Sequence, residues 1–185
     1  MNEQLARAIL DGRFEETELG LFVPSERTLV SGRFQYHKQG EPDEVSDNLV
    51  VTEGLNYLVG VALKAVTPAT NWYIGIFSGD VTVQATWTAA NVTANSTEIT
   101  AYDEVVRGTW TGGSVAAGAV NSYAAKAEFT ASQDAVIARG AFMVSNSAKG
   151  GTGGVLLGAA KFPSAKGLDT GEVLSVGYGL QLTPV

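Results

Sequence analysis

The chain contains a single histidine, His37, and histidine is the side chain most often used as a base near neutral pH. It lies between Tyr36 and Lys38 at the end of a predicted strand. A histidine-based triad also needs a serine or cysteine nucleophile, yet the sequence has no cysteine and no strained G-x-S-x-G turn. We therefore interpret His37 as a solvated side chain and predict no catalytic residue.

Carboxylates are the remaining candidates for a metal site, because thiolates are absent and imidazole occurs once. They gather in two groups, Glu41/Asp43/Glu44/Asp47 and Asp103/Glu104. The first group is interrupted by a proline and lacks the spacing of a calcium loop, which is typical of a polar hairpin tip. The second group indicates a solvated strand edge, and neither group favours the facing pair that a glycosidase needs. We expect no metal and no cofactor.

Three tryptophans could stack on sugars or anchor a protein interface. Trp72 lies in the apolar hexamer WYIGIF, so we expect it in the core. Trp87 and Trp110 lie among threonine and glycine, and we predict that they are exposed aromatic anchors. A glycan-binding or receptor-binding module that uses these two rings and the loop at 80–101 therefore remains an alternative.

Residues 48–79 organise the predicted fold around one helix and one strand. Thr52 is expected to cap the helix, with Glu53 in its first turn. The helix should bury one apolar stripe: Leu55, Leu58, Val59, Ala62 and Leu63. The strand at 72–77 is apolar on both faces, which predicts a layer on each side of it.

The rest of the chain indicates short strands joined by turns. We predict further strands at 30–38, 45–51, 103–113, 119–131, 135–145, 155–162 and 173–183. Residues 80–101 have few large apolar groups and predict a long surface excursion, which Val81, Val83 and Trp87 could pin to the domain. The glycine-rich 145–154 predicts a mobile hairpin rather than a phosphate loop. The expected fold is mainly β, a β-sandwich or jelly-roll-like domain with one central helix.

The N-terminal residues 1–29 have no clean strand or helix period beyond a short helical spacing at 2–11, which Gly12 ends. We interpret them as an extended arm with a helical tip, followed by a single β-rich domain at 30–185. The predicted partner-binding anchors of the arm are Leu5, Ile9, Phe14, Leu21 and Phe22. The alternative is an ordinary lead-in that lies on its own domain.

Charge is scarce in this chain of 185 residues: charged residues make up 17%, against about 25% in typical soluble domains. Fewer ions then need desolvation at an interface, which is consistent with an oligomer or lattice partner. The alternative is a β-protein rich in small residues with a bland surface. The net charge of −7 and the lack of a basic run argue against nucleic acid. No apolar run approaches the roughly 20 residues of a membrane helix, so we expect a protein made in a cytoplasm and no membrane partner.

Three ordered sequence blocks resemble a family of small structural proteins of tailed bacteriophages. They are NLVVTEGLNYL at Asn48–Leu58, WYIGIF at Trp72–Phe77 and TAYDEVVR at Thr100–Arg107. The resemblance covers roughly the middle third of the chain. It implies a component of the virion, often of the head, without enzymatic activity.

Within that family, the acidic charge and the predicted arm suit a capsid cement or decoration protein. Such a protein would bind the major capsid protein and copies of itself, as a homo-oligomer on the capsid surface of the virion. A head–tail connector, tail or fibre component is the alternative, although fibres more often show sequence repeats and none is visible here.

Overall fold

The computed structural model describes residues 14–16, 22–24 and 28–184 of the chain, and side chains from residue 28 onward. Strands account for 46% of the protein and helices for 11%, so the fold is mainly β, as predicted. The part of the chain that the structure describes contains no helix long and apolar enough to cross a membrane.

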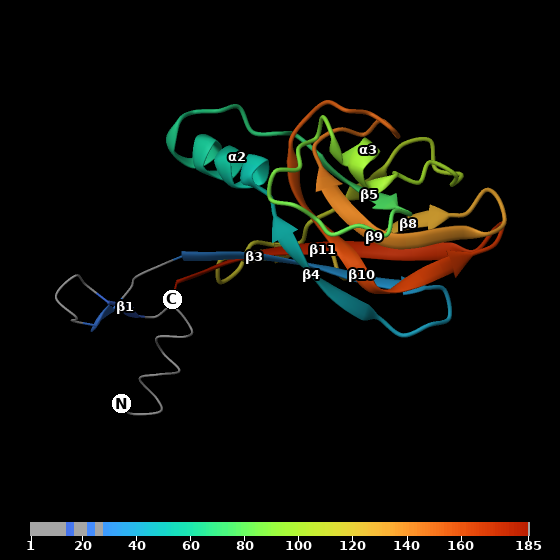
Figure 1. Cartoon of the computed structure of the whole chain (residues 1–185), viewed down its shortest axis with the longest axis horizontal. Coiled ribbons are helices and arrows are strands. Elements are labelled where there is room, and N and C mark those ends of the chain that lie inside the picture. The colour runs from blue at the N-terminus through green and yellow to red at the C-terminus, as the bar shows by residue number, and fades with distance from the viewer. Residues whose placement is uncertain (1–13, 17–21, 25–27, 185) are drawn as a thin grey trace.

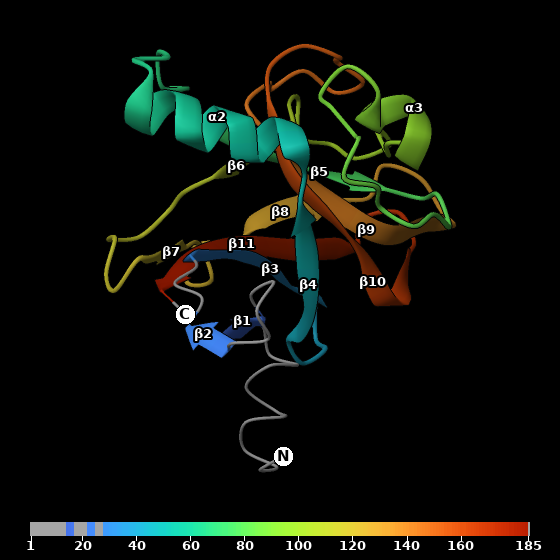
Figure 2. The same cartoon turned by 60° about the vertical axis from the view of Figure 1, so that its left-hand side comes forward.

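Nine antiparallel strands form one sheet that curls into a half-barrel (Figure 1). They are β3 (Thr28–Lys38), β4 (Glu44–Val50), β5 (Trp72–Phe77), β6 (Gly108–Trp110), β7 (Ala119–Asn121), β8 (Ala127–Thr130), β9 (Val136–Val144), β10 (Leu156–Leu168) and β11 (Val173–Pro184). Their order is β6-β5-β9-β10-β4-β3-β11-β7, and β8 also pairs with β11. The curl brings β3 and β11 opposite β5 and β9 (Figure 2).

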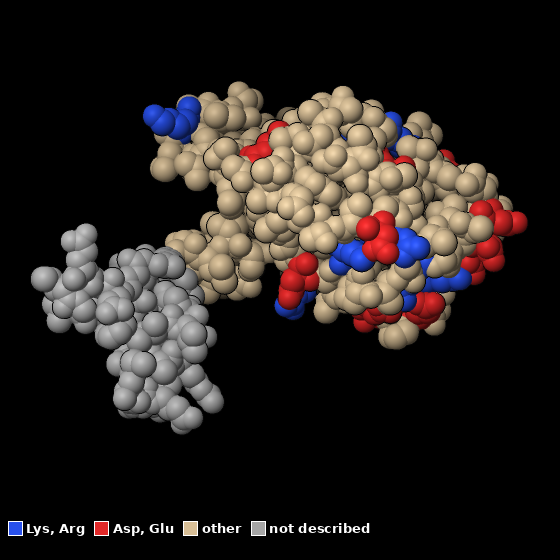
Figure 3. Space-filling model, in the orientation of Figure 1, with Lys and Arg blue, Asp and Glu red and all other residues tan. Residues whose placement is uncertain are grey.

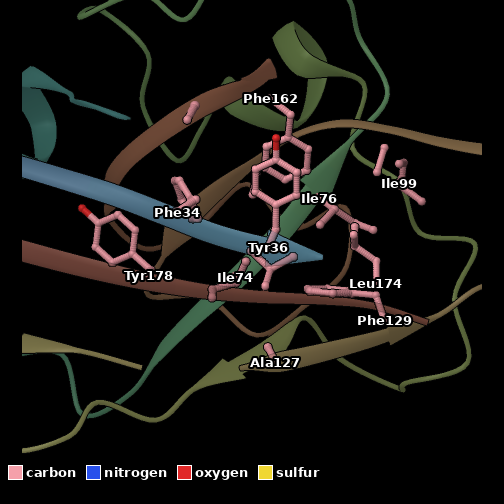
Figure 4. Close-up of a cluster of buried hydrophobic side chains, with 14 of the residues drawn as sticks. Phe34, Tyr36, Ile74, Ile76, Ile99, Ala127, Phe129, Phe162, Leu174 and Tyr178 are labelled. Carbon is pink, nitrogen blue, oxygen red and sulfur yellow. The ribbon is translucent and has the colours of Figure 1, made fainter. Parts of the chain in front are cut away.

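The inner face of this curled sheet holds the main core. Alternation along β11 places Leu174, Val176 and Tyr178 inside with no exposed area. Phe34 and Tyr36 face them from the neighbouring β3, and Figure 4 shows these rings converging with side chains of other strands. The core therefore follows from strand alternation over paired segments that are far apart in the chain.

Several predicted strand limits were wrong. The strand expected at 103–113 shrinks to the three residues of β6. The strand expected at 119–131 divides into β7 and β8, because a turn closes where the amide of Ala125 donates to the carbonyl of Ser122 at 2.9 Å. β10 continues to Leu168 past Pro163, where a register shift between Lys161 and Lys166 accommodates the proline.

A second layer covers the outer face of β5, β9 and β10. Ile74 and Ile76 of β5 belong to the inner core, whereas Phe77 belongs to an outer cluster with Trp87 and Val92. This confirms that β5 is buried on both faces. The segment 80–101 folds back over the sheet and includes the short helix α3 (Val92–Ser96). Trp87 is only 5% exposed, so the prediction that it is an exposed anchor was wrong, whereas the expected pinning of this segment by Val81, Val83 and Trp87 was confirmed.

The main helix, α2 (Thr52–Leu63), lies at one end of the half-barrel and projects beyond it (Figure 1). It is not the central helix that the sequence predicted. Its N-cap is Val51, without a side-chain capping bond, so the expected cap at Thr52 was also wrong. The N-terminal strands β1 (Phe14–Glu16) and β2 (Phe22–Pro24) pair with each other in a separate two-stranded sheet.

Candidate protein-interaction site

Four apolar residues on one side of α2 are exposed to solvent. Leu55, Val59 and Leu63 expose 38%, 56% and 78% of their surface, and Ala62 lies exposed beside them. Their spacing of three or four residues places them along one side of the helix, and we call these four residues the α2 stripe. The sequence predicted that this stripe is buried, and that prediction was wrong.

The first turn of α2 is fixed to the sheet. Gly54 is the only buried residue of the helix, and it lies against the backbone of Leu157 in β10. One carboxylate oxygen of Glu53 accepts the amides of Leu156 at 2.6 Å and of Ala89 at 2.8 Å. These contacts set the direction of the helix, so its second half extends past the edge of the sheet.

A different flank of α2 faces the protein. Leu58 is partly buried and packs against the inner core. The hydroxyl of Tyr57 accepts the amide of Ala69 at 2.6 Å, and its ring meets Trp72 edge-on at 5.4 Å. The apolar arc of the helix is thus wider than the surface that covers it. The α2 stripe is the uncovered part of that arc.

The end of the molecule at α2 is poor in charge. Figure 3 shows the projecting part of α2 as mostly uncharged apart from a basic group at its tip and an acidic group at its base, with a hollow between it and the end of β3 and β11. Leu29 of β3 and Leu182 of β11 are also exposed at these strand ends. Burying such a surface removes apolar area from water without desolvating many ions, so this end is the best candidate for binding another protein.

The acidic hairpin tip is a set of ion pairs. Lys166 lies 2.6 Å from Glu41 and 2.6 Å from Glu44, and Glu44 also accepts the hydroxyls of Tyr36 and Ser164. Hydrogen bonds from Lys166 and Ser164 hold the pKa of Glu44 below its ordinary value. Within the described residues, no group of three or more histidine, cysteine, aspartate or glutamate side chains could hold a metal ion.

His37 forms a hydrogen-bonded pair with Asp43, next to the ion pairs of the hairpin tip. Its Nδ1 lies 2.7 Å from a carboxylate oxygen of Asp43, which also contacts Lys126 at 3.3 Å. Burial alone would raise the pKa of Asp43, but the hydrogen bonds from His37 and Lys126 outweigh it and lower that pKa. His37 is therefore engaged by a carboxylate rather than simply solvated.

Glu104, expected on a solvated edge, accepts the amide and hydroxyl of Thr130.

A fully buried ion pair joins Arg107 to Glu98. The guanidinium donates to both carboxylate oxygens at 2.8 Å and 2.7 Å, and both side chains have no exposed area. Arg107 also donates to the carbonyls of Asn146 and Gly151, while Glu98 accepts the amide of Gly150. The loop at 145–154, expected to be a mobile hairpin, is thus tied to the body of the protein. Sequence reasoning missed the pair, since no spacing rule relates an arginine to a glutamate nine residues earlier in a threonine-rich segment.

The structure places only some of the predicted anchor residues. Trp110 is partly buried against the core, and its Nε1 donates to the carbonyl of Tyr178 at 2.9 Å, so it is not a free exposed ring. Leu5, Ile9 and Leu21 lie outside the described residues. Phe14 and Phe22 belong to the paired strands β1 and β2. Partner binding by the arm stays a prediction. Leu29, placed in the arm, pairs with Thr183 within β3 and β11.

A groove on the outer face of β3, β4, β7 and β11 is more polar. Arg33, Gln35, Asp47 and Tyr123 line it, and the guanidinium of Arg33 pairs with Asp47 at 2.7 Å. Both charged groups are largely exposed, so the pair contributes little to stability. This groove brings together no residues that sequence analysis singled out for chemistry.

No protein-family model, curated protein or solved structure matches this chain. The phage resemblance therefore rests on the three sequence blocks alone.

Proposed function

We propose that this protein is a non-enzymatic structural protein of a tailed-phage virion. In this proposal it acts as a capsid cement or decoration protein that binds between major capsid subunits and stabilises the head. The observation that supports it most is the α2 stripe. Covering exposed leucine and valine on a projecting helix with a neighbouring protein lowers the free energy, because it removes apolar surface from water. The low charged share of the chain favours the same kind of burial.

Two further features suit such a role. The sheet and the buried Arg107–Glu98 pair give a frame to which the loop at 145–154 is tied. A binding surface on such a frame loses little entropy when it docks. The proposal includes a homo-oligomer, with the arm residues as additional anchors, and a relationship of the curled sheet to sandwich or jelly-roll folds.

The alternatives differ in where on the particle the protein would lie. A head–tail connector, tail or fibre component would use the same apolar surface at another site. The glycan-binding alternative has lost its main support, because Trp87 is buried and Trp110 is bonded to the protein.

The decisive experiment adds the purified full-length protein to phage heads that lack it and images the particles. We expect density between major capsid subunits, and heads that withstand heat or low salt better than bare heads do. Density at the neck, tail or fibres would replace the cement role with the alternative. Absence of binding to any part of the particle would overturn the proposal.

A further inference from the structure

We propose that the α2 stripe binds the apolar side of residues 2–11 of a second copy of this chain. This inference deepens the proposed function and rests on it, because it assigns the surface that joins neighbouring copies. The stripe is a solvent-exposed apolar row that residues 28–184 of its own chain leave uncovered.

The sequence of the proposed occupant matches the stripe in length and pattern. Leu55 and Leu63 are eight residues apart, which is about 12 Å along a helix axis. Residues 2–11 would span about 14 Å as a helix, with Leu5, Ala6 and Ile9 on one side. A ten-residue helix is marginal alone in water, so this segment gains from docking on an apolar surface. The segment as a helix would match the α2 stripe in overall length, and its apolar residues Leu5 to Ile9 would cover about 6 Å of the stripe.

The position of the arm also favours this surface. β3 begins at Thr28 on the same side of the molecule as α2 (Figure 1 and Figure 2). Phe14 lies opposite Pro24 in the β1–β2 pair, so residues between them add little reach. The remaining links allow Asp11 to lie at most about 30 Å from Thr28. The length of the chain is thus compatible with the proposed docking at the end of the molecule that carries the stripe.

An exchange between two copies accounts for both surfaces at once. If each copy places its residues 2–11 on the other's α2, both stripes are buried in one closed, two-fold interface. Charge favours an antiparallel arrangement, because it brings Glu3 near Lys64, whereas a parallel one brings Glu3 near Glu53. The antiparallel arrangement also places Ala6 near Ala62.

The absence of cysteine from the chain makes a direct test simple. Full-length A6C and A62C proteins are prepared separately, mixed and oxidised, and the products are separated on non-reducing gels. We expect a disulfide-linked heterodimer. The matched control is A6C mixed with Q133C, in which the second cysteine occupies an exposed position away from α2.

Three outcomes would overturn the proposal. A link that forms only within single chains of an A6C/A62C protein would show that the arm covers its own helix. A predominant A62C homodimer would show that α2 pairs with α2. A yield no higher than that of the Q133C control would show no docking at this surface.

Variants that introduce charge into the α2 stripe separate binding from folding. In an A62C protein that also carries V59E and L63E, the yield of heterodimer should fall at least about ten-fold. At a concentration low enough to keep the protein monomeric, the thermal midpoint should stay within about 2 °C, because both side chains are already exposed. V115E, at another exposed valine, should leave the yield unchanged.

The same proteins distinguish this inference from the proposed function. Cross-linking in solution without binding to phage heads would remove the cement role and leave the exchange of arms in place. Binding to heads without cross-linking would remove only the exchange.

Discussion

Helix α2 and the segment 80–101 differ from their predicted burial in opposite directions. The helix has large apolar residues at helical spacing, and yet the α2 stripe faces solvent. The segment is rich in threonine, alanine and asparagine, and yet Trp87, Ala89 and Val92 are buried in it. Local composition predicted the reverse in both cases.

The difference shows that coverage, not composition, decided burial. Small residues let the segment 80–101 turn tightly over the sheet, and its polar groups find partners there, as where the hydroxyl of Ser96 donates to the carbonyl of Val92 at 2.6 Å. Within residues 28–184, no layer covers the second half of α2. A second copy or another partner would supply one.

The largest expected change in the free energy of unfolding comes from removing the arginine that pairs with Glu98 of the covered segment. Arg107→Met should destabilise the protein by about 4 kcal/mol, because it leaves Glu98 as a buried carboxylate without its partner. Urea unfolding followed by circular dichroism measures the loss. The exposed pair offers the control, since Arg33→Met should cost less than about 1 kcal/mol. Equal effects of the two variants would contradict the structural role of the buried pair.

A slightly smaller effect is expected from the buried indole of the covered segment. Trp87→Ala should cost about 3 kcal/mol, through lost burial and the cavity that remains. Leu63→Ala in the α2 stripe should change the free energy of unfolding by less than about 0.5 kcal/mol for the monomer. If the Leu63 variant is the more damaging one in dilute solution, the assignment of the two surfaces is wrong.

Two glycines within α2 test where the helix is held. Gly54→Ala should destabilise by about 1–2 kcal/mol, because the added methyl would clash with the backbone of Leu157. Gly60→Ala meets only the exposed side chain of Val66, which can move, so the better helix propensity should leave stability unchanged or raised by up to about 1 kcal/mol. Thermal unfolding of both variants measures the difference, and a harmless Gly54→Ala would show that the helix is not anchored there.

The smallest effect concerns acid, and it should arise far from the α2 stripe. The native pKa of Glu44 is lowered by the bonds from Lys166 and Ser164, so its pairing stabilises the protein fully above the ordinary pKa of about 4.5. This stabilisation is lost as the pH falls below that value and through the native pKa. Urea midpoints at a series of pH values should therefore drop in that window. Lys166→Met should flatten the drop, whereas Leu63→Ala should leave it unchanged.

Part of the candidate site was visible in the sequence. The helix over residues 52–63 and its apolar residues followed from their spacing, because helical periodicity is a local property. The sequence could not indicate which flank of the apolar arc would face the sheet. That choice came from Gly54 and Glu53, which contact Leu157 and Leu156 of β10, about a hundred positions later in the chain.

The sequence by itself determined the period-two faces of β3 and β11 and the double burial of β5, because successive side chains of a strand must point to opposite sides. Tertiary structure alone decided that Trp87 is covered, that Arg107 meets Glu98 and that the α2 stripe is bare. Those outcomes depend on which distant segments pack together, and burial is a property of the pair of surfaces rather than of either one.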